Sequence, residues 1–197
     1  MTSRHFSARI LASVALLFGA SAPLSAQLGA IGSAAHRLIR FSVSGGATLP
    51  AGDLKNTHDT GFHMDGGLYL NIPGFPVKIR PELSFTKLKF KDLLIPSIAT
   101  TNPNTQLLSG IGNIEVPLLM GLYVIGGVGA MNLKNNIGAT GDSSQTNLVI
   151  DAGAGIRARI KQVDIFVEAR VGSASYDKGK FGYSKAQFIP VTFGLVF

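Results

Sequence analysis

The chain has 197 residues, a formal net charge of +7, 46% hydrophobic residues and no cysteine. The absence of cysteine excludes a disulfide-stabilised secreted scaffold, and the basic excess is spread along the chain without a Lys/Arg tract or a nucleic-acid-binding motif. The composition therefore predicts one domain that is held together by apolar burial and strand hydrogen bonds, with no nucleic acid as partner.

Residues 1–26 have the pattern of a cleaved signal peptide. Arg4 and Arg9 form a basic start, residues 10–20 are apolar, and small residues precede a predicted cleavage between Ala26 and Gln27. The apolar run is too short to cross a bilayer, which takes about 20 helical residues. We expect export from the cytoplasm, a periplasmic N-terminal segment over residues 27–37 and one barrel domain over residues 38–197.

Eight segments of the barrel domain have the alternating pattern of β-strands. They cover residues 38–49, 61–72, 77–88, 106–117, 121–132, 146–160, 163–173 and 186–197. Each is at least as long as the roughly 9–11 residues that a tilted transmembrane strand needs. Short connections (73–76, 118–120 and 161–162) alternate with longer, mostly polar ones (50–60, 89–105, 133–145 and 174–185). This alternation predicts a membrane barrel with short periplasmic turns and long outer loops.

The last strand carries a continuous apolar row that ends on an aromatic residue. The row consists of Ile189, Val191, Phe193, Leu195 and Phe197. A transmembrane strand places such a row against lipid, with its final aromatic at the membrane interface.

Three strands set a charged row against an apolar row, at residues 77–88, 146–160 and 163–173. Alternation alone does not say which row faces inward, because a membrane barrel inverts the polarity of a soluble one. The signal peptide, the loop asymmetry and the final strand favour the inverted arrangement. The predicted lumen network comprises Arg40, Asp65, Lys78, Arg80, Glu82, Glu115, Asp151, Arg157, Arg159, Asp164, Glu168 and Arg170.

The short connections also predict the strand register. A two-residue turn at residues 161–162 places Arg159 opposite Asp164, and the connection at residues 73–76 places Asn71 opposite Lys78. Pro81 and Pro190 each lack a ladder donor, so we expect local bulges there.

Some faces and motifs are less informative. Residues 121–132 are apolar on both faces, so neither face can be assigned. Residues 58–63 offer two histidines and one carboxylate, which is too few ligands for a structural metal site and predicts a solvated loop. Glycines at residues 126–129 are not followed by the helix that a dinucleotide loop requires. Ser42 and Ser44 lack a nucleophile–base–orienter set. We therefore expect no enzyme activity, cofactor or metal.

Four segments, at residues 41–46, 49–53, 123–129 and 190–197, have a sequence similar to that of known proteins. In these segments the chain resembles the eight-stranded outer-membrane β-barrel family that includes OmpA, OmpX and the opacity proteins. The resemblance implies that the outer-membrane assembly machinery recognises the terminal strand, and it implies no substrate. Aromatic girdles would rely on Phe41, Phe62, Phe85, Phe193 and Phe197.

The sequence as a whole predicts an all-β protein: a monomeric, eight-stranded, antiparallel up-and-down barrel in outer-membrane lipid. The expected role is structural, or surface interaction with an unknown extracellular partner through the loops. One alternative is a small channel of low conductance. Another is a soluble, lipocalin-like carrier with its apolar faces turned inward around a ligand.

Overall fold

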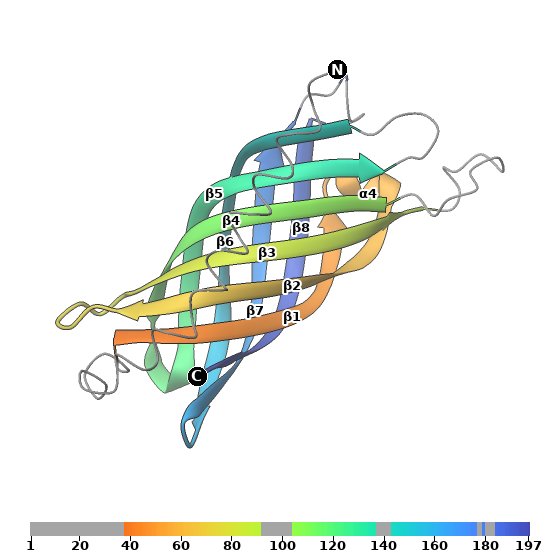
Figure 1. The fold of residues 1–197 in the computed structure, drawn as a ribbon. Coiled ribbons are helices and arrows are strands. Elements are labelled where there is room, and N and C mark those ends of the chain that lie inside the picture. The colour runs from red at the N-terminus through yellow and green to blue at the C-terminus, as the bar shows by residue number, and fades with distance from the viewer. Residues whose placement is uncertain (1–37, 92–103, 137–142, 177–178, 180–183) are drawn as a thin grey trace, which may run out of the picture. The chain divides into compact units, whose positions relative to one another are not determined.

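Eight antiparallel strands form a closed barrel in the computed structural model, which describes residues 38–91, 104–136, 143–176, 179 and 184–197 (Figure 1). Each strand pairs with its neighbours in sequence, and β1 also pairs with β8. The fold class predicted above is confirmed, whereas the predicted signal peptide and the segment 27–37 lie outside the described residues. The strands are β1 (Ile39–Ala51), β2 (His58–Asn71), β3 (Lys78–Phe90), β4 (Asn104–Pro117), β5 (Leu122–Asn136), β6 (Ser143–Ile160), β7 (Val163–Ser175) and β8 (Lys185–Val196).

The two ends of the barrel differ. At one end, called the turn end, residues 72–77, the 3-10 turn η3 (Leu119–Gly121) with its flanks, and residues 161–162 join adjacent strands. The C-terminus lies at this end (Figure 1). The other end, called the loop end, holds the short helix α4 (Leu54–Thr57) and the C-terminal ends of β3, β5 and β7. No helix among the described residues has the length and apolar run needed to cross a bilayer.

The observed register agrees with the two hairpins predicted from sequence. Arg159 lies opposite Asp164 in the β6–β7 pair, and Asn71 lies opposite Lys78 in the β2–β3 pair. The tight connections depend on left-handed backbone at Lys161 (φ 58°) and Gly121 (φ 80°). A Cβ atom at Gly121 would lie 2.3 Å from the Arg157 carbonyl oxygen, so only glycine fits this turn.

The expected bulges at the two prolines are not found. Pro81 pairs with Gly112 and Pro190 pairs with Thr48 without a change of register. Each proline removes one ladder donor, and the many remaining hydrogen bonds of a closed sheet hold the strands in line. The register shift that does occur lies between Asp59 and Phe62, near the loop end of β2.

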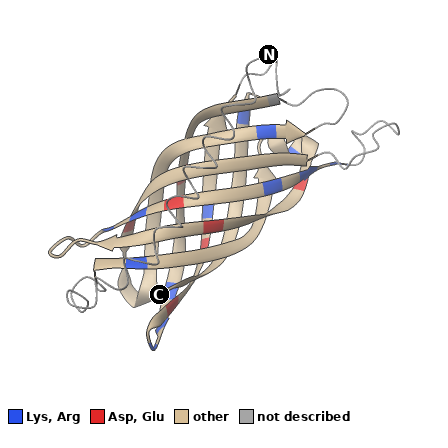
Figure 2. Ribbon diagram, viewed as in Figure 1, with Lys and Arg blue, Asp and Glu red and all other residues tan. Residues whose placement is uncertain are grey.

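The apolar rows face outward, as the inverted arrangement predicts. On β6, Leu148, Ile150 and Ile156 are at least half exposed, while their neighbours of opposite parity point inward. Every residue of the terminal row that ends at Phe197 also has the outward parity. Most of the ribbon is uncharged, and charged residues of both signs occur along its length (Figure 2).

The five phenylalanines expected to form girdles are all exposed on the outer face. Phe41 and Phe197 lie side by side near the turn end, where their backbones exchange two hydrogen bonds. Phe62 and Phe85 lie toward the loop end, with ring centroids 6.4 Å apart. Aromatic rings therefore occur near both ends of the apolar exterior, although the chain contains no tryptophan.

Candidate functional site

The inward-facing positions bring opposite charges together inside the barrel. The twelve charged residues predicted for the lumen divide equally by sign, into the bases Arg40, Lys78, Arg80, Arg157, Arg159 and Arg170 and the acids Asp65, Glu82, Glu115, Asp151, Asp164 and Glu168. All twelve occupy inward positions of their strands. Arg159 differs from the rest, because its side chain is 69% exposed at the rim of the turn end. The set carries no net charge, which lowers the cost of enclosing it.

Two arginines and two glutamates form a compact quartet at the centre of the network. Arg80 donates from Nε to Glu82 at 2.7 Å and from Nη1 to Glu168 at 2.8 Å. Arg170 donates from Nη2 to Glu82 at 2.6 Å and from Nε to Glu168. Each guanidinium thus contacts both carboxylates, and all four side chains are less than 10% exposed. A buried ion pair is tolerated only when every charged group has its partners. In the quartet each guanidinium has two carboxylates and each carboxylate has two guanidinium groups.

Two neutral side chains satisfy the remaining acceptors of the quartet. Asn113 donates from Nδ2 to Glu82 at 2.8 Å, and the Tyr123 hydroxyl donates to Glu168 at 2.8 Å. Such additional hydrogen bonds offset the desolvation of the carboxylates. They also fix the orientation of the two glutamates.

Aromatic rings and guanidinium groups alternate beside the quartet. Arg80 lies between the rings of Phe166 and Tyr69, 4.9 Å from each centroid. Arg157 lies between Tyr69 and Tyr123, at 4.6 and 5.0 Å. This aromatic–arginine column of five residues contributes cation–π attraction in a desolvated setting. It blocks the middle of the lumen with large, rigid groups.

Inward glycines make room for this column. A Cβ atom at Gly155 would lie 2.4 Å from the Tyr123 hydroxyl, and one at Gly194 would lie 2.3 Å from the Phe166 ring. Real Cβ contacts are not this short, so any larger residue would displace a ring. Gly155 of β6 and Gly194 of β8 are therefore explained by the packing of these rings in the lumen.

At the turn end the ion pairs are more open. Glu115 accepts from Lys78 at 3.3 Å and from Arg157 at 2.6 Å. Asp164 accepts from Arg40 and, at 2.8 Å, from Arg159. These pairs border a hollow of about 310 Å³ that opens at this end. The turn end of the lumen is therefore accessible to solution.

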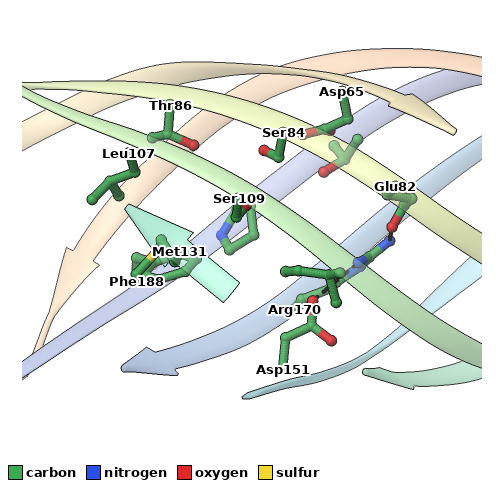
Figure 3. Close-up of a pocket in the computed structure, with 13 residues that line it drawn as sticks. Asp65, Glu82, Ser84, Thr86, Leu107, Ser109, Met131, Asp151, Arg170 and Phe188 are labelled. Atoms are coloured by element: carbon green, nitrogen blue, oxygen red, sulfur yellow. Dashed lines mark hydrogen bonds and ion pairs between the residues drawn. The ribbon is translucent and has the colours of Figure 1, made fainter. Parts of the chain in front are cut away.

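On the loop side of the quartet lies a small cavity of about 40 Å³. Figure 3 shows Glu82, Arg170 and Asp151 on one side of this cavity, with Leu107, Met131 and Phe188 on the other. The hydroxyls of Ser84, Thr86, Ser109 and Thr192 complete much of its wall. At this size the cavity has room for a few water molecules at most.

An apolar cluster closes the lumen at the loop end. Leu54 of α4 is fully buried in it, together with inward residues from β3 to β8. The cluster comprises Leu54, Leu88, Leu107, Met131, Leu133, Val149, Ala174, Tyr176, Ala186 and Phe188. The interior thus changes from charged to apolar along its axis, and we call this cluster the loop-end plug.

The two histidines of residues 58–63 do not form the solvated loop that the sequence suggested. Both are nearly fully buried in β2. His63 contacts Thr48 and Thr192 at 2.9 Å, with the Asp65 carboxylate at 3.6 Å. His58 lies beside the loop-end plug and contacts Thr57 and Thr105 at 2.7 and 2.6 Å.

Burial lowers the pKa of His58 to about 4, although its backbone partner Leu54 and the charge of Asp59 act in the opposite direction. Within the described ranges, no group of three or more His, Asp or Glu side chains could hold a metal ion.

Several residues that shape the lumen were not among the predicted site residues. They are Tyr69, Asn113, Tyr123, His63 and Phe166, and all occupy inward positions of their strands. His63 and Tyr69 share the parity of Asp65 in the sequence, and Phe166 shares that of Asp164, so alternation alone places these three residues inward. Tyr123 could not be placed in this way, because neither face of β5 could be assigned. The structure turns its odd-numbered residues inward, from Tyr123 to Asn135.

The distribution of polarity contradicts the lipocalin-like alternative. A soluble carrier would need its apolar rows inward around a ligand cavity. Here the large apolar side chains cover the exterior, and buried charge fills the middle of the lumen. The cavity on the loop side of the quartet, at about 40 Å³, is too small for a carried ligand.

No protein-family model matches this sequence, and no curated protein matches it either. Solved structures do resemble it. Neisserial surface protein A shares 12% identity over 80% of this chain and 95% of its own, with a TM-score of 0.55. Ail, the attachment invasion locus protein of Yersinia pestis, shares 14% identity over 81% of this chain and 99% of its own in a complex with the heparin analogue sucrose octasulfate, with a TM-score of 0.57. The fold of this chain is that of the eight-stranded outer-membrane β-barrels.

Proposed function

We propose that this protein resides in a bacterial outer membrane, with its lumen closed to ions, and binds an anionic partner through its loop end. The observation that carries the proposal is an excess of lysine at the loop end of a closed barrel. Among the described residues this end carries two acids, Asp53 and Asp59, against six bases: Lys55, Lys87, Lys89, Lys91, Lys134 and Lys185.

The exterior supports residence in lipid. Outward positions on all eight strands hold large apolar side chains, and their exposed fractions reach 67% at Leu148. A surface of this kind in water would be an extended apolar patch, which soluble monomers do not present. In a bilayer the same surface is the stable arrangement.

The interior supports a closed lumen and not a pore. The quartet and the aromatic–arginine column fill the middle, and the loop-end plug covers the side toward α4. The cavity of about 40 Å³ and the hollow of about 310 Å³ lie on opposite sides of this filling. Eight strands enclose a space that side chains can fill, whereas water-filled channels occur in barrels of about 16–18 strands. This favours a surface role over the small-channel alternative.

The register places some of the loop-end lysines in a common patch on the outer face. Lys87 of β3 lies opposite Gln106 of β4, which lies opposite Lys134 of β5. Lys89 occupies the next outward position of β3, opposite Asn104. Adjacent strands lie about 4.8 Å apart, so Lys87 and Lys134 are separated by roughly 10 Å. This spacing suits a partner with repeated anionic groups, such as a sulfated saccharide.

The test is binding of heparin to the purified barrel in detergent micelles, because a heparin analogue binds one protein of this fold. We expect binding that weakens as salt rises, since cationic contacts release counterions from a polyanion. Replacing Lys87 and Lys89 by Gln should weaken binding and reduce its salt dependence. Lys161→Gln, at the opposite end, is the matched control and should bind like the wild type. Equal binding by all three proteins would contradict the proposed surface.

A further inference from the structure

The turn end of the lumen contains a hollow with an unusual charge environment. Its volume of about 310 Å³ is at the lower limit of pockets that hold small ligands. The polar and charged groups that line it are Lys78, Glu115, Tyr123, Arg157, Arg159 and Asp164. These residues come from β3 to β7, so the hollow is formed by the closed barrel and not by a single hairpin. We call it the turn-end vestibule.

Positive charge exceeds negative charge around the vestibule. Glu115 is already shared by Lys78 and Arg157, and it also lies 3.7 Å from Arg80. Asp164 is likewise shared by Arg40 and Arg159. Within the predicted network, four bases therefore meet two carboxylates at the turn end, which leaves an excess of two positive side-chain charges.

The compensating negative charges lie too far away to neutralise this excess. The central quartet is balanced within itself, so the two remaining acids of the network are Asp65 and Asp151, beside the small cavity on the loop side. Asp151 precedes Arg157 by six residues on β6, which corresponds to roughly 20 Å along an extended strand. The lumen is neutral as a whole, but its charge is sorted along the axis.

Two buried polar atoms near the vestibule have no hydrogen-bond partner within the protein. They are Arg157 Nε and the Tyr69 hydroxyl. The Arg157 side chain is only 10% exposed, and the rings of Tyr69 and Tyr123 hold its guanidinium group from two sides. Arg157 is thus fixed in place and lines the vestibule, and its buried Nε has no hydrogen-bond partner within the protein. A planar guanidinium group held in this way suits an oxyanion.

We propose that the turn-end vestibule binds a small oxyanion, a carboxylate or phosphate group, through Lys78, Arg157 and Arg159. The excess positive charge attracts the anion, the volume admits it, and Arg157 supplies a guanidinium group that two tyrosine rings hold in place. The group could belong to a soluble molecule or to a lipid headgroup at the membrane surface. This site lies at the opposite end from the lysine patch and does not depend on it.

The experiment is a phosphorus NMR titration of inorganic phosphate against the barrel in phosphate-free maltoside micelles. We expect saturable binding by the wild type and at least a tenfold weaker association for the double variant Lys78→Met, Arg159→Gln. Lys161→Gln removes a charge from the same end without touching the vestibule, so it should bind phosphate like the wild type. Heat-dependent gel mobility confirms that each variant is folded.

A second arm identifies the source of the anion. Displacement of inorganic phosphate by added phosphatidylglycerol, but not by phosphatidylcholine, assigns the vestibule to an anionic lipid headgroup. Retention of phosphate in the presence of both lipids assigns it to a soluble anion. The proposal is overturned if the wild type does not bind phosphate, or if the double variant binds it as well as Lys161→Gln does. Heparin binding in the same samples reports on the lysine patch independently.

Discussion

At the scale of single residues, the same ion-pair chemistry has different consequences at the centre and at the rim of the barrel. Glu168 is fully buried and contacts Arg80, Arg170 and Tyr123. Arg159 forms an ion pair of similar length with Asp164, but its side chain is mostly in solvent. Water screens the second interaction and not the first.

Glu168→Gln should therefore lower the free energy of unfolding by about 3 kcal/mol or more, because it leaves two buried guanidinium groups short of a carboxylate. Arg159→Gln should lower it by less than about 1 kcal/mol. Urea unfolding in lipid vesicles, followed by gel mobility without boiling, measures both. Similar losses for the two variants would show that burial does not decide the strength of the network.

A second residue-scale prediction tests the lipid face. Val167 has an outward position on β7 and is 47% exposed. A cation near the bilayer midplane costs roughly 2–4 kcal/mol, so Val167→Arg should reduce the amount of folded barrel in the outer membrane. Val167→Leu is the matched control and should accumulate normally. Normal levels of the arginine variant would contradict the assignment of this face to lipid.

At the scale of elements, polarity along each strand explains which parts of the fold could be predicted. Strands β3, β6 and β7 place charge inside and apolar residues outside, so their alternation is visible in the sequence. In the loop-end half of β5, the inward residues Met131 and Leu133 belong to the loop-end plug. In its turn-end half, the outward residues Val124 and Val128 are exposed on the lipid-facing exterior. Both of its faces are therefore apolar over residues 121–132, and the alternation disappears.

Neither the loop-end limits of several strands nor helix α4 could be predicted from the sequence pattern. Several strands extend further toward the loop end than predicted, as β5 does to Asn136 and β6 does from Ser143. Beyond the apolar exterior these strands carry polar residues, which in sequence look like loop. Helix α4 has four residues, too few to show a helical period, and burial of Leu54 in the plug holds it in place. The aromatic–arginine column depends on contacts between distant strands, which alternation does not report.

His58 makes the loop-end plug sensitive to acid. The outward residues at the same level of the barrel as His58 are the charged pair Asp59 and Lys89. His58 therefore lies beyond the apolar part of the exterior. Its pKa is lowered to about 4 in the folded state because burial disfavours the charged ring. Above pH 6.5 the ring is neutral in both the folded and the unfolded state, and its full contribution to the free energy of unfolding is present. As pH falls from 6.5 to 4 the unfolded chain binds a proton that the folded chain does not bind, so stability is lost.

The expected loss is about 3 kcal/mol by pH 4, on the scale of 1.36 kcal/mol per pKa unit. The pH dependence of unfolding in His58→Gln should be shallower than in the wild type over this range. Other carboxylates titrate in both proteins, so only the difference between the two curves is informative. Superimposable curves would contradict a neutral, buried His58.

At the scale of the whole molecule, the barrel combines an apolar exterior with a lumen filled in layers. From the turn end these layers are the vestibule, the central quartet with its aromatic–arginine column, the small cavity and the loop-end plug. A lumen filled in this way leaves the two ends of the molecule as its accessible surfaces. The lysine patch and the turn-end vestibule lie at those two ends.

A filled lumen predicts that the protein does not conduct ions. Purified barrel added to a planar lipid bilayer should produce no unitary current steps above those of detergent alone. A large porin reconstituted in the same way is the positive control. Reproducible steps that disappear after immunodepletion of the barrel would support the small-channel alternative in place of a closed lumen.

The most direct test of the whole account is the gel mobility of the protein from fractionated cells, with and without boiling. The account predicts a band in the outer-membrane fraction that migrates differently after boiling, because a folded membrane barrel resists detergent until it is heated. A band in the soluble periplasmic fraction, with the same mobility before and after boiling, would contradict the lipid-facing exterior and with it the proposed residence in the membrane.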